Sequence, residues 1–495
     1  MYKAFVAALC AFMLIAAAPA TPAPPEKPAP GGTAWTPHEI AALRHAVQTI
    51  LNAPTLRGAQ IGFLVRDTVR GTVLYSQNAQ QDFMPASNFK LLVGSASLQR
   101  LGTNFAFVTS VAGDAPPQNG TLAGNLYLHG GGDAHLTAQD LDDAAAALAA
   151  QGIKRVTGAV ITDPTRYDSQ RYGYGWSWDD LPYYYAPVVT ALELEEGVVH
   201  MTFSPGPSAG SLAVLRVWPQ SNAYTIDNEL MTGPAGSKDT SDILRPWNKP
   251  DTIEIAGNYP LGAKESGDVN PAVPDPESYA GDVFARALGA HGITVAGGVH
   301  DGKMPATADV LWTHESEKMP KLLADFWYPS DNLMGELFLK ELGVAQAGEP
   351  GTDEHGMILE ENFLRSIGVD PDTVTIADGS GLSQYDRITP ADLVAILQAD
   401  WNGPNRDVVL DALPVAGVRG TLRRSYIGTP AERAVFAKTG SISHVRTISG
   451  FVRTRTHGAV TFSLLINQWM GEQQPKGAAA LAKVRGDLFS QLAIQ

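Results

Sequence analysis

Ser87 and Lys90 are the first pair of side chains in this sequence whose types and spacing could do chemistry. They lie in the stretch MPASNFKLL, just after a proline and at the head of an apolar run. Three residues apart on a helix, the two side chains would share one face, with their Cβ atoms about 5–6 Å apart. The amine could then take the hydroxyl proton and make the serine a nucleophile. A serine at a helix start with a solvated lysine one turn later is the structural alternative.

Lys90 can act as a base only when its amine is neutral. With an ordinary lysine pKa of about 10.4, roughly one amine in 2,500 is neutral at pH 7. Burial and a second nearby cation would both lower this pKa. A catalytic pair would therefore need further polar or charged groups beside it.

Two later stretches contain such motifs. Ser330-Asp331-Asn332 precedes an apolar helical pattern, where helix capping is the alternative role. Lys438-Thr439-Gly440 lies in a strand-like segment, where a turn is the alternative. Each of these two tripeptides is expected by chance in roughly 5–10% of chains of this length. Both tripeptides together with the Ser87–Lys90 pair, in this order, would therefore seldom arise by accident.

The order of the three motifs is the one shared by penicillin-binding proteins and class A β-lactamases. Further segments, GNLYLHGGGDAHLT, IADGSGLSQYDRITP and LPVAGVRGTLRR among them, extend the similarity from about residue 40 to the C-terminus. The chain resembles the class C low-molecular-mass penicillin-binding proteins. These are the D-alanyl-D-alanine carboxypeptidases and endopeptidases of the penicillin-binding protein 4 type.

This resemblance implies hydrolysis of the bond between two D-alanines in peptidoglycan peptides, with β-lactams as covalent inhibitors and with neither cofactor nor metal. Ser87 would carry the acyl group, and Lys90, Ser330 and Asn332 would move and orient protons. Lys438 would be the second cation that keeps Lys90 partly neutral.

The resemblance also assigns substrate-binding residues. Lys438 and Thr439 would face the terminal carboxylate of the substrate. Gly440 would let the peptide lie against the strand, and the backbone N–H groups of Ser87 and Ser441 would form the oxyanion hole.

Two positions bear on the side chain of the third stem-peptide residue. By resemblance, Asp163 would contact the free amine of a diaminopimelic side chain. Gln384 stands where Arg is common, and it cannot form a charged bidentate contact. Preference for that side chain then depends on whether Arg387 substitutes.

The implied fold is α+β: an antiparallel sheet flanked by helices, with two small, mostly β domains inserted. Between about residues 105 and 310, strand-length apolar runs alternate with Gly and Pro turns, and long helical patterns return after about 318. Strands within 61–75 and 447–468 are expected to pair in one sheet. The expected domains are 36–108 with 315–495 (DD-peptidase), 109–195 with 265–314 (inserted), and 196–264 (nested).

The composition and the N-terminal sequence indicate which partners the protein would bind and in which cellular compartment it would lie. The 495 residues carry 36 Lys and Arg against 51 Asp and Glu, a net charge of −15, which argues against nucleic acid and anionic membranes. Residues 1–20 resemble a signal peptide ending in Ala18-Pro19-Ala20, so we expect a periplasmic or extracellular protein with no membrane span after cleavage. Residues 21–35 are a Pro-rich linker. The oligomeric state stays open.

Other features of the sequence would suit four alternative functions or sites. His129 to Gly132 reads HGGG and Gly206 to Gly210 satisfies Gly-x-Ser-x-Gly, which would suit an esterase, but Ser208 is followed by a strand pattern where the nucleophile elbow needs a helix. His129 and His135 suggest a metal site, but no third ligand is evident. A serine β-lactamase or a non-catalytic cell-wall binding protein would retain the same pocket.

Overall fold

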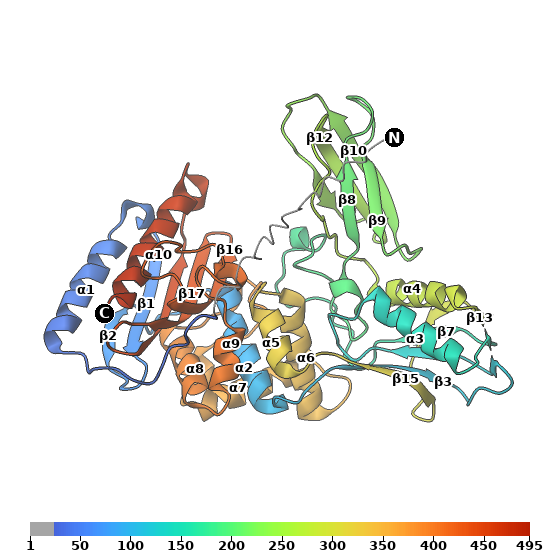
Figure 1. Cartoon of the computed structure of the whole chain (residues 1–495), viewed down its shortest axis with the longest axis horizontal. Helices are drawn as coiled ribbons and strands as arrows, with labels where there is room; N and C mark the ends of the chain where they lie inside the picture. Colours follow the sequence, from blue (N-terminus) through green and yellow to red (C-terminus); the bar gives the residue numbers. More distant parts are fainter. Residues whose placement is uncertain (1–23) are drawn as a thin grey trace, which may run out of the picture.

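The motif-bearing sheet is built from both ends of the chain. The structure, a computed structural model, describes residues 24–495, so the predicted signal peptide lies outside the described residues. The strand order is β16-β17-β18-β1-β2, and all neighbours are antiparallel (Figure 1). The strands are β1 (Gln60–Asp67), β2 (Val73–Gln77), β16 (Val435–Ile442), β17 (Val445–Arg453) and β18 (Ala459–Asn467). Phe63 of β1 pairs with Leu464 of β18, which confirms the expected pairing of the two ends.

Helices cover both faces of this sheet. On one face lie α1 (Pro37–Leu51) and α10 (Gly477–Ala493), whose apolar side chains share a core with Phe63 and Phe462 (Figure 1). The other face carries α2 (Lys90–Leu101), α5 (Met319–Trp327), α6 (Asn332–Ala347), α7 (Asp353–Ser366), α8 (Pro390–Asn402) and α9 (Arg406–Ala412). Their core includes Leu92, Trp327 and Leu337. The strands alternate their side chains between the two cores because successive residues point to opposite faces.

The helical pattern expected after residue 318 is interrupted at the second motif. It forms two helices, α5 and α6, separated by Tyr328 to Asp331. Ser330 adopts a positive φ of 71°, and the Asp331 carboxylate caps α6 by accepting the Met334 N–H at 3.0 Å. The break places Ser330 and Asn332 at a helix start, where their side chains can point toward the sheet.

The region between the first two motifs is rich in strands, as expected. A mixed sheet of order β14-β7-β5-β3-β15 packs near α3 (Ala138–Ala150) and α4 (Pro276–Ala290) (Figure 1). Its strands are β3 (Val108–Gly113), β5 (Leu126–His129), β7 (Val160–Asp163), β14 (Val299–Asp301) and β15 (Asp309–Glu315). A small parallel sheet has the order β13-β6-β4, from β4 (Thr121–Leu122), β6 (Arg155–Val156) and β13 (Thr294–Val295).

A second group of strands projects from this region (Figure 1). It contains the hairpin of β8 (His200–Ser204) and β9 (Val214–Trp218), and the sheet β10-β12-β11. The latter strands are β10 (Thr225–Gly233), β11 (Asp242–Leu244) and β12 (Thr252–Pro260). The domain boundaries given above remain a prediction.

The segment before α1 lies against the sheet domain. Residues 24–35 form neither helix nor strand, but Trp35 is buried and stacks on His457 with ring centroids 4.0 Å apart. Among residues 24–495, we find no helix with the length and apolar character needed to cross a membrane.

Candidate active site

Ser87 is held between the start of α2 and strands of the sheet. It lies in a 3-10 turn, Ala86–Phe89, which leads directly into α2. The carbonyl of Pro85, two residues before the serine, accepts the Thr447 hydroxyl at 2.7 Å. The Asn88 amide donates to Ser449 Oγ at 2.7 Å. These bonds from β17 fix the turn on both sides of the serine.

Lys90 lies beneath Ser87 and is fully buried. Its Nζ is 3.0 Å from Ser87 Oγ, 2.6 Å from Asn332 Oδ1 and 2.5 Å from the Ser380 carbonyl oxygen. The three acceptors match the three donors of an ammonium group. The amine is therefore within reach of the hydroxyl proton, as the spacing predicts.

The third motif closes the other side of the site. Lys438 is fully buried in β16, and its Nζ donates to Ser330 Oγ at 2.7 Å and to the Thr439 carbonyl at 2.8 Å. Asn332 in turn donates from Nδ2 to the Tyr185 carbonyl at 2.7 Å. The three motifs, far apart in sequence, thus meet around one serine.

An open cavity of about 430 Å³ lies above these groups. Its lining comes from all three motifs, from the inserted region and from the loop after residue 380. The lining residues are Ser87, Asp180, Tyr184, Tyr185, Ser330, Asn332, Leu382, Gln384, Thr421, Thr439, Ser441, Ile442 and Ser443. This volume lies within the range of small-molecule and peptide sites.

Burial lowers the pKa of Lys90 to about 8, although the charges of Asp378, Asp331, Glu336 and Asp386 act to raise it. At that pKa, roughly one amine in ten is neutral at pH 7. Lys90 can therefore serve as a base near neutrality, because it is buried beside Ser87.

The two lysines affect each other differently from the expectation that Lys438 keeps Lys90 partly neutral. The pKa of Lys438 lies well below its ordinary value, first because of burial and then because of the positive charge of Lys90. Repulsion between two cations is mutual, so the amine closer to carboxylates keeps its proton longer, and that amine is Lys90. Burial, more than Lys438, accounts for the lowered pKa of Lys90.

The loop Asp378 to Ser383 organises the floor of the site, and sequence reasoning missed its role. The buried Asp378 carboxylate accepts the N–H groups of Ser380 at 3.1 Å, Gly381 at 2.6 Å and Ser383 at 2.8 Å, and also Trp176 Nε1 at 2.8 Å. It thereby fixes the Ser380 carbonyl that receives Lys90. The segment IADGSGLS shows an acid and two glycines, which indicates a loop, but nothing in it shows where the loop lies.

Gly440 lies where the sheet approaches the serine turn most closely. A Cβ on this residue would lie 2.2 Å from Thr447 Oγ1, 2.8 Å from the Pro85 carbonyl oxygen and 2.9 Å from the Ser87 nitrogen. Only glycine fits this contact without displacement. Ser441, the next residue of β16, lines the cavity, and the oxyanion role of its N–H remains a prediction.

The structure does not bring Asp163 to the cavity. Its carboxylate is buried at the end of β7 and is bonded to His129 Nδ1 at 3.1 Å and to the N–H groups of Thr165 and Met304 at 2.8 Å each. Those bonds outweigh burial and lower the pKa of Asp163 to about 2. The expected contact with a substrate amine is thus corrected, because Asp163 has a structural role in the inserted sheet.

Gln384 does line the cavity, as expected, whereas the Arg387 guanidinium turns back to the carbonyls of Gln384 and Asp386, each at 2.7 Å. The carboxylate that lines the cavity from the inserted region is Asp180, together with Tyr184 and Tyr185. Sequence reasoning missed Asp180, since WSWDDLPYYY shows two adjacent acids and no periodicity that orients them.

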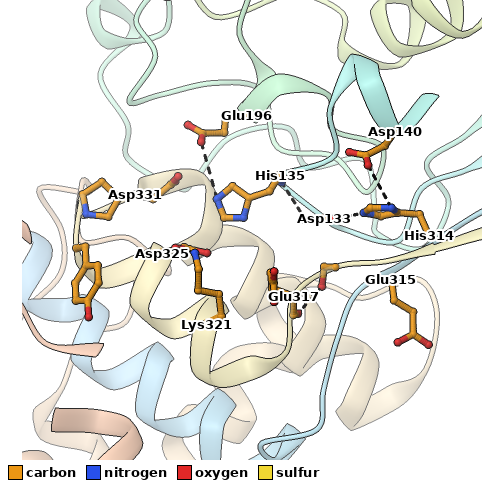
Figure 2. Close-up of a pocket in the computed structure, with 13 residues that line it drawn as sticks. Asp133, His135, Asp140, Glu196, His314, Glu315, Glu317, Lys321, Asp325 and Asp331 are labelled. Atoms are coloured by element: carbon orange, nitrogen blue, oxygen red, sulfur yellow. Dashed lines mark hydrogen bonds and ion pairs between the residues drawn. The ribbon is translucent and has the colours of Figure 1, made fainter. Parts of the chain in front are cut away.

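A second, larger cavity of about 700 Å³ lies on the far side of the Ser330 motif. Figure 2 shows Asp331 there, with His135 directed toward Glu196. The ligand atoms of His135, Glu196 and Asp331 lie within 4.8 Å of one another. This corrects the expectation that His135 has no further candidate ligands. Because carboxylates often gather near a surface histidine without an ion, we assign no metal to this cluster.

The Gly-x-Ser-x-Gly segment does not form a nucleophile elbow. Ser208 is exposed in the turn between β8 and β9, and a strand follows it, not a helix. This geometry excludes the esterase alternative at Ser208, because the elbow requires a strand-turn-helix arrangement.

Comparison with known proteins agrees with this geometry. Residues 43–487 match the model of the D-Ala-D-Ala carboxypeptidase 3 (S13) family. A D-alanyl-D-alanine carboxypeptidase of an Actinomadura species is 35% identical over 446 residues, covering 87% of this chain and 82% of the relative. The chain therefore belongs to the D-Ala-D-Ala carboxypeptidase 3 (S13) family and is a serine-type carboxypeptidase.

Solved structures establish the fold independently. The crystal structure of penicillin binding protein 4 (dacB) from Haemophilus influenzae superposes with a TM-score of 0.82 at 24% identity, covering 91% of this chain and 99% of the other. The same protein in complex with a β-lactam gives a TM-score of 0.76 at 22% identity. The α+β penicillin-binding fold expected from the sequence is confirmed.

Proposed function

We propose that this protein removes the terminal D-alanine from peptidoglycan stem peptides, or cuts D-alanine cross-links between them, through an acyl-enzyme on Ser87. One observation carries the proposal: the buried Lys90 amine, with a pKa near 8, lies 3.0 Å from Ser87 Oγ inside an open cavity. The D-alanyl-D-alanine carboxypeptidase relative supports the substrate class.

In the proposed reaction, the first motif carries the chemistry, Asn332 of the second motif holds the Lys90 amine at 2.6 Å, and the third motif binds the substrate carboxylate. Lys90 takes the Ser87 proton as Oγ attacks the carbonyl carbon between the two D-alanines. The Lys90 ammonium then gives this proton to the leaving D-alanine amine, and water hydrolyses the ester to release the shortened peptide. A substrate carboxylate at Thr439 and Lys438 would favour the protonated form of the Lys438 amine, because an opposite charge stabilises the charged form.

The Asp180 carboxylate gives the cavity a group that can pair with a substrate amine. It lines the cavity beside Tyr184 and Gln384, so we propose that it, and not Asp163, faces a third stem-peptide residue with an amine-bearing side chain.

The location of the protein is proposed from its N-terminus. Residues 1–20 have the features of a cleavable signal peptide, and a peptidoglycan substrate requires a periplasmic or extracellular enzyme. N-terminal sequencing of the protein secreted by its host should begin after Ala20.

The test of the proposed function is release of D-alanine together with labelling by penicillin. The wild type should release D-alanine from a pentapeptide and form a persistent adduct with fluorescent penicillin at Ser87. Ser87→Ala should do neither, and labelling of that variant would contradict the proposal. Rapid nitrocefin turnover would favour a β-lactamase, and acylation without D-alanine release would favour a cell-wall binding protein.

A further inference from the structure

A basic cavity adjoins the active-site cavity along strand β16. It has a volume of about 640 Å³ and shares Thr421, Thr439 and Ser441 with the active-site cavity. The side chains of Thr421 and Thr439 meet at the boundary, with their hydroxyl oxygens 2.7 Å apart. A ligand that occupies the active site can therefore continue into this second space.

The charge of this cavity is opposite to that of the whole protein. Its basic lining residues are Arg424, Arg446, Lys483 and Arg485, and Asp487 is the acidic one among the lining residues that the structure describes. Asp487 already pairs with Lys483 at 2.5 Å. In a chain with a net charge of −15, this concentration of cations favours an anionic ligand.

Arg485, on α10, has guanidinium donors for which the described part of the chain supplies no acceptor. Its Nε and Nη2 atoms are buried, and within the described part of the chain they have no hydrogen-bond partner. Burial and the nearby charge of Arg446 lower the pKa of Arg485, whereas Tyr426 acts to raise it, but an arginine keeps its charge in proteins. Buried donors without partners are rare and costly, and because Arg485 also lines the cavity, a shift of its side chain would let a bound anion pair with these donors.

Arg446 occupies a fixed position in the same cavity. It is paired with Ser441 in the register of β16 and β17. Its Nη1 donates to the carbonyls of Ile442 and Val445, each at 2.7 Å, and its guanidinium lies over the Trp469 ring at 5.3 Å. A guanidinium held in this way loses little conformational freedom when it binds a ligand.

We propose that this basic cavity binds a carboxylate of the acceptor peptide, the strand that departs when the enzyme cuts a cross-link between two stem peptides. This inference rests on the proposed function. In the proposed substrate orientation, Thr439 faces the part of the substrate beyond the scissile bond. A departing D-alanine ends there, whereas an acceptor stem peptide continues past Thr439 and Ser441 and carries further carboxylates. Arginine pairs with carboxylates through two parallel hydrogen bonds.

The test compares three substrates: a pentapeptide, a cross-linked dimer with free acceptor carboxylates, and the same dimer in which every acceptor carboxylate except the one that faces Thr439 is converted to a carboxamide. Arg485→Gln should raise KM for the free-acid dimer about tenfold or more, the effect of losing a hydrogen bond between charged groups. D-Alanine release from the pentapeptide and acylation by penicillin should stay within about twofold, because neither reaction fills the basic cavity.

Two controls make the result specific. Arg423→Gln removes an exposed arginine that lines neither cavity, and it should leave KM for the dimer unchanged. The carboxamide dimer should have the raised KM already in the wild type, with no further rise in Arg485→Gln, since both changes remove the same contact. Additive effects of the two changes would overturn the inference, as would an equal loss of pentapeptide and dimer cleavage.

A binding measurement separates this inference from the proposed function. Calorimetry with the isolated acceptor peptide, which cannot be cleaved, should show binding to the wild type and at least tenfold weaker binding to Arg485→Gln. If inorganic phosphate binds in an Arg485-dependent way and the peptide does not, the site is a phosphate site and the inference is wrong. A wild type that releases D-alanine from the pentapeptide but never cuts the dimer also overturns the inference while the proposed function stands. If the pentapeptide releases no D-alanine and the dimer is not cut into two stem peptides, the proposed function fails, and the calorimetry alone decides the inference.

Discussion

Gly440→Ala is the substitution for which the structure gives the clearest magnitude. The new Cβ would lie 2.2 Å from Thr447 Oγ1 and 2.9 Å from the Ser87 nitrogen. An ordinary contact needs about 1 Å more at Thr447, and Thr447 cannot move away without losing its 2.7 Å bond to the Pro85 carbonyl. The serine turn must therefore shift by a similar distance. A misplacement of about 1 Å in a reacting geometry costs on the order of 100-fold in rate.

The assay is the rate of Ser87 acylation by a fluorescent penicillin under single-turnover conditions, with the unfolding temperature measured in parallel. We expect acylation to fall about 100-fold and stability to fall by about 1–3 kcal/mol, the usual effect of overpacking. Gly289→Ala is the matched control, because that glycine lies in α4 with no atom within 4 Å of the added Cβ. Acylation within threefold of the wild-type rate in Gly440→Ala would refute the argument.

Two further predictions follow from buried ionisable groups. The acylation rate should rise with pH through a midpoint near 8, because only neutral Lys90 accepts the Ser87 proton. Asp378→Asn removes a charge that raises the pKa of Lys90, so the midpoint in a pH profile of acylation should move to lower pH. An unmoved midpoint would contradict the role of Asp378. Burial raises the pKa of Asp400, which accepts the Ser95 hydroxyl, to about 7. Its contribution to stability is therefore present below about pH 4 and is lost as pH rises through 7. Asp400→Asn should raise the unfolding temperature more at pH 8 than at pH 5, as thermal melts would show, whereas an equal change at both pH values would argue against the shifted pKa.

Much of the site can be predicted from the sequence because its key residues lie in three short motifs. Each motif precedes or occupies a strongly patterned helix or strand. The residues concerned are Ser87 and Lys90, Ser330 and Asn332, and Lys438. The strand-like patterns within residues 447–468 likewise indicate strands, and the structure places them as β17 and β18 within the sheet. The local sequence pattern is enough to predict a site residue when that residue lies in, or next to, the helix or strand that positions it.

The remaining site residues depend on long-range contacts that no local pattern encodes. Asp378 acts through backbone N–H groups and through Trp176, some 200 residues away. Asp163 and Asp180 are both acids in the inserted region, and only the packing of that region decides that Asp180 lines the cavity. Arg485 lies on an amphipathic helix, where a basic residue on the polar face is usually solvated. Arg485 stands out from other basic residues only in the structure, where its buried guanidinium atoms lack acceptors.

Because β1 pairs with β18 near the other end of the chain, we expect the active site to form late in folding. Phe63 and Leu464 are partners across about 400 residues of chain, and closing a loop of that length costs about 5 kcal/mol of chain entropy beyond a constant term. The first and third motifs cannot meet until that loop has closed. Penicillin labelling therefore reports on completed folding as well as chemistry: a chain that has built its inserted sheets but has not yet added its last strands would have compact structure without a reactive serine.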